Sequence, residues 1–167
     1  MSPLLDLLIT FLYIGRDRLK SMYQERKDLS KVMRKKFSAL AQKYGERVLN
    51  IPKNTISMAM SLSATLESDA ETQLGATLFR KRVSGLRVVA RGGTKTIAPY
   101  TFHGWGASVK AFPTSYITAA CAVGTTEKDI DEFLKRLDKC LKDMQKKKNK
   151  IKKISDDISG DVDEKNI

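Results

Sequence analysis

At residues 71–90 the chain reads ETQLGATLFRKRVSGLRVVA, which begins with a helical pattern and ends with a strand pattern. Ser68 stands three residues before Glu71, the spacing of a capping box, in which each side chain satisfies a free backbone N–H of the other. Leu74 and Leu78 then recur at helical spacing and provide a face to bury. We therefore predict a helix that begins near residue 68.

Three consecutive cations, Arg80, Lys81 and Arg82, lie near the end of this helix. The end itself is predicted at residues 84–85 (Ser-Gly), because glycine adopts the left-handed conformation of a helix C-terminus without strain. Residues 86–89 are predicted to form a short strand. Two interpretations of the cations remain open. They stabilise the negative end of the helix dipole, by about 0.3–1 kcal/mol each, or they form a positive clamp for a nucleic-acid phosphate or base edge.

The charge of the chain is strongly unbalanced. Its 167 residues include 31 Lys and Arg against 19 Asp and Glu, for a formal net charge of +12. This excess favours polyanionic partners, either nucleic acid or an anionic membrane surface. One histidine and two cysteines are too few for a convincing zinc site. Without a signal peptide, we expect Cys121 and Cys140 to be free thiols in a reducing compartment, the cytoplasm.

Two helices are predicted before residue 50. Residues 4–14 are almost wholly apolar, too short to span a bilayer, and must be buried against a partner surface absent from this chain. Residues 16–48 form a long amphipathic helix whose outer face is cationic. We interpret that face as solvated, with RNA contact as the alternative.

The remaining elements complete an α+β fold, a small three-stranded antiparallel sheet backed by helices. They are a strand at 56–62 with a methionine row in the core, a hairpin turn at 91–93 leading to a strand at 94–97, a ring-rich loop at 99–113, a short helix from 114 or 115 to 123, and a last helix from 126 to 144. Residues 1–148 are assigned to one domain, and residues 149–167 to a charged, disordered tail whose first part is a fraying helix end.

The ring-rich loop contains Tyr100, Phe102, Trp105 and Lys110 among its residues. Aromatic side chains interleaved with a cation can stack on bases, or they can pack the loop onto the sheet. We expect packing onto the sheet. His103 has no serine or cysteine partner that the sequence places beside it, so no catalytic role is assigned to it.

Several blocks of sequence resemble one enzyme family in the same order along the chain. They are SPLLDLLITFLYIG, QERKDL, ISMAMSL, TQLG-x-x-LF-x-x-x-VSG-x-R, TFHGWG and DIDEFLKRLDKCLK. Together they resemble the C-terminal part of O-phosphoseryl-tRNA(Sec) selenium transferase, also called Sep-tRNA:Sec-tRNA synthase or soluble liver antigen. The resemblance covers residues 2–147, nearly the whole chain.

The resemblance implies a fold-type-I pyridoxal-phosphate enzyme that converts O-phosphoseryl-tRNA(Sec) to selenocysteinyl-tRNA(Sec) with selenophosphate. In this family the Schiff-base lysine and the arginine for the substrate phosphate precede the matching segment. We therefore expect the C-terminal small domain, or a truncated gene model of it, with no catalytic or cofactor-binding residue of its own. The family also implies a homotetramer and a missing N-terminal catalytic domain.

The resemblance further implies contacts to tRNA(Sec). The position that reads the discriminator base in the family is occupied here by Lys81, which cannot make arginine's two-pronged contact to guanine. Arg80 or Arg82 can substitute, or discrimination is weaker. A second family contact, on the last helix, matches Lys146. The alternative functions are a stand-alone basic RNA-binding module without catalysis and, with least support, a structural or membrane-surface adaptor.

Overall fold

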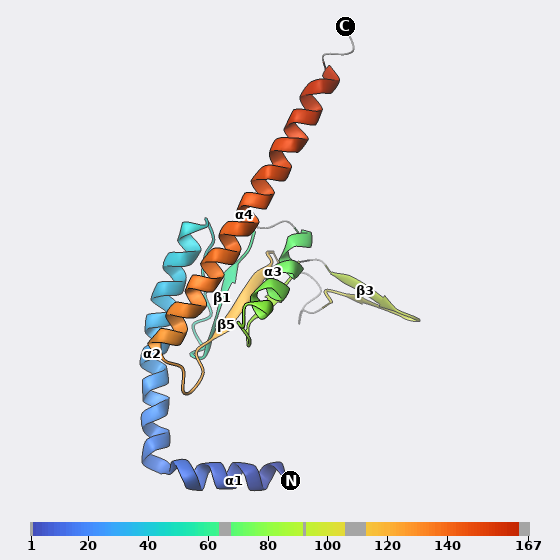
Figure 1. Cartoon of the computed structure of the whole chain (residues 1–167). Helices are drawn as coiled ribbons and strands as arrows, with labels where there is room; N and C mark the ends of the chain where they lie inside the picture. The colour runs from blue at the N-terminus through green and yellow to red at the C-terminus, as the bar shows by residue number, and fades with distance from the viewer. Residues whose placement is uncertain (1, 64–67, 92, 106–112, 164–167) are drawn as a thin grey trace.

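The computed structural model describes residues 2–63, 68–91, 93–105 and 113–163, and confirms an α+β fold (Figure 1). Its elements in chain order are α1 (Pro3–Ile14), α2 (Arg16–Lys43), β1 (Ser57–Ser61), α3 (Ser68–Arg80), β2 (Arg87–Val89), β3 (Thr94–Ile97), β4 (Tyr100–His103), β5 (Tyr116–Ala120) and α4 (Glu127–Asp163). Within the described part of the chain, no helix is both long enough and apolar enough to cross a bilayer.

The main sheet has three antiparallel strands in the order β1-β5-β2. Its central strand, β5, is the segment that the sequence reasoning had assigned to a short helix, so that prediction was wrong. Ile117 and Ala119 are buried while Tyr116 and Thr118 are half-buried, which is the period-two pattern of a strand. An apolar run this short does not distinguish a buried strand from a helix by pattern alone.

The predicted hairpin across residues 91–93 was also wrong. β2 pairs with β5, and β3 pairs instead with β4 in a separate two-stranded sheet. Figure 1 shows this hairpin projecting away from the main sheet. Tyr100, Phe102 and Trp105 are exposed, and Phe102 packs edge-on against Trp105 with ring centroids 5.6 Å apart. The expected packing of these rings onto the sheet is therefore not seen; residues 106–112, including Lys110, lie outside the described part of the chain.

One apolar core joins the sheet to three helices. It contains Phe37 of α2, Leu74 and Leu78 of α3, and Leu137 and Leu141 of α4, all of them fully buried. The methionine row of β1 lies in this core as predicted, with Met58 and Met60 buried. Cys121 and Cys140 are buried free cysteines, also as expected.

The two N-terminal helices are joined at Gly15, whose φ of 72° lies in the left-handed region that glycine adopts without strain. Figure 1 shows α1 turning sharply away from α2 at this residue. No side chain of α1 is buried, and its large apolar residues from Leu4 to Tyr13 are exposed, Tyr13 at 90%. The long second helix ends at Lys43 rather than near Val48, which instead bridges to Met60 of β1.

Helix α4 extends well past the last apolar residue of its core face (Figure 1). It runs through Asp163, so most of the segment that sequence reasoning had assigned to a charged tail continues the helix. The described part of α3 begins at Ser68, at the predicted start. Glu71 is buried at 5% exposure, and its carboxylate bonds to the Ser115 side chain and the Arg91 backbone.

Candidate nucleic-acid interface

The three cations at residues 80–82 lie at the end of α3, in a turn that differs from the predicted one. The Arg82 N–H donates to Phe79 O at 2.9 Å, and the Val83 N–H donates to Leu78 O at 3.0 Å. These two bonds form a Schellman motif, in which the residue after the cap is left-handed. That residue is Arg82, with φ of 59°, and not the glycine at position 85.

Arg136 of α4 closes this turn from outside. Its Nη1 donates to the carbonyl oxygens of Lys81 at 2.9 Å and Arg82 at 3.2 Å. Its Nε donates to Glu132 at 2.9 Å, one turn earlier on the same helix. The guanidinium therefore satisfies two carbonyls that the end of α3 leaves open, and it fixes the left-handed turn against α4. The sequence contained no signal for this contact, because the partners are more than fifty residues apart.

Together these elements line a shallow hollow of about 550 Å³ between the end of α3 and α4. Six of its lining residues are cations, and the one carboxylate, Glu132, is already bonded to Arg136. The cations are Arg80, Lys81, Arg82, Lys135, Arg136 and Lys139. The last three were not among the predicted site residues. The four-residue spacing of Lys135 and Lys139, beside the buried Leu137, could have marked them as neighbours on one face.

The side chain of Lys81 is less free than those of its neighbours. It is 32% exposed, and its Nζ lies 4.0 Å from the Asp143 carboxylate. Burial raises the pKa of the Cys140 thiol, and the adjacent Lys81 ammonium opposes that rise. Arg80 and Arg82, in contrast, are exposed. The structure therefore brings together three of the four predicted residues and leaves the two arginines more accessible than the lysine between them.

The fourth predicted residue, Lys146, is exposed on α4 and does not line the hollow. It stands seven residues after Lys139, which places it two turns and about 10 Å farther along the helix on nearly the same face. An extended polyanion that fills the hollow can therefore follow this face of α4 toward Lys146.

Among the residues that the structure describes, no three His, Cys, Asp or Glu side chains are grouped to hold a metal ion. Nor do the described residues fit pyridoxal phosphate. Such a site needs a lysine for the Schiff base beside an acidic partner for the ring nitrogen. A groove along α2 contains lysines but no carboxylate, and a hollow beside β5 contains Asp129 and Glu132 but no lysine. The hollow at the end of α3 contains lysines, but its carboxylate, Glu132, is already bonded to Arg136.

Comparison with known proteins identifies the family of this chain. The sequence model of "O-phosphoseryl-tRNA(Sec) selenium transferase, SepSecS" matches residues 1–142. The chain belongs to the O-phosphoseryl-tRNA(Sec) selenium transferase family. This is a family of transferases, and the resemblance seen in the sequence motifs is thereby confirmed.

Relatives of the same name come from distant organisms. The Caenorhabditis briggsae transferase is 34% identical over 136 residues, covering 81% of this chain and 28% of the relative. The Dictyostelium discoideum transferase is 33% identical over 155 residues, covering 83% and 32%. That of Methanocaldococcus jannaschii is 31% identical over 140 residues, covering 84% and 29%. The chain thus spans under a third of the length of these transferases.

A solved structure supports the fold. The crystal structure of an archaeal O-phosphoseryl-tRNA(Sec) selenium transferase superposes with a TM-score of 0.64 at 23% identity, covering 82% of this chain and 28% of that one. The arrangement of small antiparallel sheets and helices described above is therefore one that a selenium transferase of this family adopts.

Proposed function

We propose that this chain supplies tRNA-binding surface to an enzyme that converts O-phosphoseryl-tRNA(Sec) to selenocysteinyl-tRNA(Sec) with selenophosphate. The observation that carries the proposal is the cationic hollow at the end of α3, in a chain of the selenium transferase family. The relatives are named for a tRNA substrate, and a hollow with six cations and one already-paired carboxylate is suited to a phosphate backbone.

Within the hollow, we assign different roles to the three consecutive cations. Arg80 and Arg82 are exposed and present planar forks that bind phosphate or a guanine edge in a two-pronged manner. Lys81 is held near Asp143 and beside Cys140, so it contributes positive charge and a single point contact. Lys146 extends the interface along α4. Reading of the discriminator base would then pass from Lys81 to a flanking arginine.

The chemistry itself is proposed to lie in other residues of the enzyme. The family is expected to use pyridoxal phosphate, which supplies an electron sink at the reacting carbon, on a fold-type-I scaffold. This chain would be the C-terminal small domain of that scaffold. Its own contribution is to bind and orient the acceptor end of the tRNA in the cytoplasm.

The exposed helix α1 supports a role in assembly. A helix whose apolar side chains are exposed all round needs a covering surface. We propose that an N-terminal catalytic domain and neighbouring subunits of a homotetramer provide it, with no membrane involved.

Variants of the full-length protein in which cations are replaced by neutral glutamine test this function. We expect Arg80→Gln/Arg82→Gln to weaken binding of tRNA(Sec) by about tenfold, or about 1.4 kcal/mol. The matched control is Arg16→Gln/Lys20→Gln, which removes one arginine and one lysine from exposed positions of α2 outside the hollow. Equal affinity of the two variants would contradict the proposed interface.

Base reading is tested separately with a tRNA(Sec) whose discriminator base is changed. Lys81→Ala should weaken the binding of both tRNAs to the same extent if Lys81 makes only a charge contact. A loss restricted to the cognate base would return the reading role to Lys81.

The net charge of +12 also favours a second function, a basic RNA-binding module that works without an attached enzyme. The intact mass of the native protein, captured with an antibody against this domain, separates the two. A mass well above 18.7 kDa supports the transferase, and a mass equal to that of this chain supports the module.

A further inference from the structure

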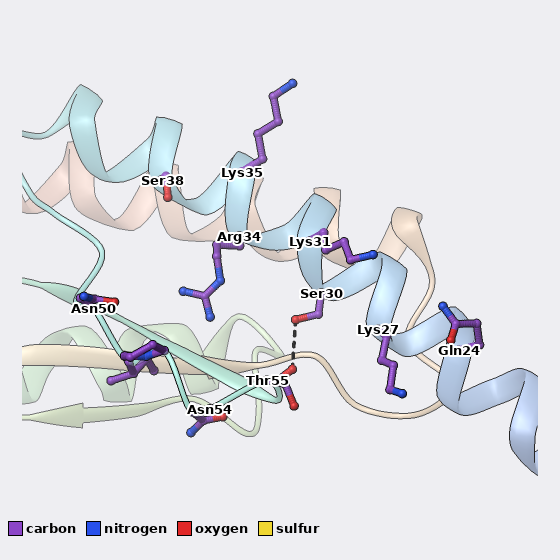
Figure 2. Close-up of a pocket in the computed structure, with 12 residues that line it drawn as sticks. Gln24, Lys27, Ser30, Lys31, Arg34, Lys35, Ser38, Asn50, Asn54 and Thr55 are labelled. Atoms are coloured by element: carbon purple, nitrogen blue, oxygen red, sulfur yellow. Dashed lines mark hydrogen bonds between the residues drawn. The ribbon is translucent and has the colours of Figure 1, made fainter.

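A second cationic surface lies on α2, on the side of the helix that faces the loop at residues 50–55. The groove there has a volume of about 690 Å³. Among the described residues, its lining includes four cations and neutral polar side chains, and no carboxylate. The cations are Lys27, Lys31, Arg34 and Lys35. We refer to this surface as the α2 groove (Figure 2).

The cations of α2 divide into two sets by their partners. On one side, Lys36 binds Glu127 and Asp131 at 2.8 and 2.6 Å, and Lys43 binds Asp138 at 2.6 Å. These pairs neutralise the lysines and attach α2 to α4. The carboxylates beside Lys36 raise the pKa of its ammonium group, as an ion pair should.

The groove cations lie on the other side. Arg34 and Lys36 are two residues apart, hence about 200° apart around the helix. Lys31 has an acidic partner, Asp28 at 2.9 Å. For Lys27, Arg34 and Lys35, no ion pair within 4.0 Å is found among the described residues, although Asp28 also interacts electrostatically with Lys27. Four cations on this side of α2 thus stand against one neighbouring carboxylate, that of Asp28, so a net positive charge remains.

The opposite wall of the groove is fixed in place. The Thr55 carbonyl oxygen accepts from Arg26 Nη1 at 3.0 Å and from Ser30 Oγ at 3.3 Å, so the loop is bound to α2 along the floor. Asn54 Oδ1 accepts from the backbone N–H groups of Ile56 and Ser57, which stiffens the turn. Figure 2 shows the side chains of Arg34 and Lys27 extending from α2 toward this loop, and that of Lys35 pointing away.

The length of the charged row suits a chain of phosphates. Lys27, Lys31 and Arg34 follow one another at intervals of four and three residues, so they form one stripe that rises about 10 Å along the helix. A row of this length can meet successive phosphates of one strand, whereas a single small anion needs only one cluster of donors. Neutral amides and hydroxyls of Asn50 and Ser38 add hydrogen-bond donors without opposing charge.

We propose that the α2 groove binds the phosphodiester backbone of RNA, as a second contact for the tRNA beyond the hollow at the end of α3. The proposal rests on the proposed function, because it takes tRNA as the partner. Lys27 and Arg34 contact successive phosphates, and Lys31 and Lys35 add to the local positive potential. Because phosphates carry no sequence, this contact adds affinity and orientation and leaves base selectivity unchanged.

The test compares two double variants of the full-length protein that lose the same side-chain types from the same helix. Lys27→Gln/Arg34→Gln removes the two cations that extend into the groove, and Arg16→Gln/Lys20→Gln removes two exposed cations outside it. Dissociation constants for a transcript of tRNA(Sec) are measured over a series of salt concentrations. We expect the groove variant to bind about tenfold more weakly, with the slope of log K against log salt reduced by about 1.4–1.8, as for two lost phosphate contacts.

The charge-conserving exchange Lys27→Arg/Arg34→Lys keeps the proposal testable if the glutamine variant folds poorly. It should retain the wild-type salt slope, since phosphate contact requires charge more than side-chain shape. An exchange variant that folds but loses the slope would overturn the proposal. So would a groove variant that matches the Arg16→Gln/Lys20→Gln control, which is also the result if other parts of the enzyme cover the groove.

Failure of this inference is distinguishable from failure of the proposed function. If wild-type protein binds the tRNA and only Arg80→Gln/Arg82→Gln weakens that binding, the α2 groove is excluded as a contact and the hollow at the end of α3 remains the proposed interface. If wild-type protein shows no salt-dependent binding, both are excluded.

Discussion

The left-handed turn at Arg82 gives a prediction in which stability and binding change independently. A residue with a Cβ pays about 1–2 kcal/mol for this conformation, and glycine does not. A glycine in turn lowers the free energy of unfolding by about 0.4–1 kcal/mol, because it gives the unfolded chain more conformational freedom. The net difference favours Arg82→Gly over Arg82→Ala by roughly 1 kcal/mol, because both variants lose the same charge while only alanine keeps the strain of φ at 59°.

Binding of tRNA(Sec), in contrast, should not distinguish the two variants. Arg82 lines the cationic hollow, and both variants remove its guanidinium. We therefore expect Arg82→Gly and Arg82→Ala to weaken the binding of tRNA(Sec) equally. For both, the slope of log K against log salt should be smaller than that of wild type by about 0.7–0.9, the value for one phosphate contact.

The assay is a urea titration of the three proteins beside a binding titration at several salt concentrations. If the glycine and alanine variants have equal free energies of unfolding, position 82 is not left-handed and the Schellman turn is wrong. If both variants bind the tRNA as wild type does, the charge of Arg82 has no part in the interface, whatever its effect on stability.

Three further variants test the packing that positions the hollow. Arg136→Ala leaves the carbonyls of Lys81 and Arg82 without their donor, so the free energy of unfolding from urea titration should fall by about 1–3 kcal/mol; an unchanged value would mean that water replaces the guanidinium without cost. Burial raises the pKa of the Glu71 carboxyl, and its Oε2 has no hydrogen-bond partner among the described residues. Its folded-state pKa lies above the unfolded one, so stability is lost as pH rises from the unfolded pKa, near 4.5, through the folded pKa. Glu71→Gln should lose less stability than wild type across that range, and parallel stability–pH curves would contradict the assignment. Leu78→Ala removes a fully buried side chain of α3 and should cost about 2–5 kcal/mol by the same titration, whereas a cost below about 1 kcal/mol would place Leu78 outside the core.

Long periodic segments could be predicted from the sequence because their pattern is internal to them. The stripe of α2 and the alternation at residues 56–62 each repeat often enough to exclude the other period. Helix α2 nevertheless ends earlier than its apolar pattern, since Val48 continues the spacing but pairs with Met60 as a bridge. Pattern identifies an element more securely than its ends.

The features that failed depend on partners distant in the sequence. Residues 116–120 are a strand because β1 and β2 flank them on both sides, which five apolar-rich residues do not reveal. The turn after α3 is left-handed at Arg82 although a glycine follows three residues later, and Arg136 of α4 bonds to the carbonyl oxygens of this turn. Glu71 has the spacing of a cap but is buried beside Ser115 and Arg91 instead.

The candidate site could be predicted only in part for the same reason. The run of cations at residues 80–82 is visible in the sequence, and so is Lys146 through the family resemblance. The opposite wall of the hollow, with Lys135 and Lys139, requires knowledge that α3 packs on α4. The pairing of Lys36 and Lys43 with α4 likewise depends on carboxylates more than ninety residues away.

The central claim, that this chain binds tRNA(Sec) through unneutralised cations, is tested most directly by the salt dependence of wild-type binding. We expect phosphate contacts from Arg80, Arg82, Lys146 and the α2 groove. The slope of log K against log salt should then be steeper than about −3, because each contact contributes about −0.7 to −0.9 to the slope. An affinity that stays constant from low to physiological salt would contradict the account.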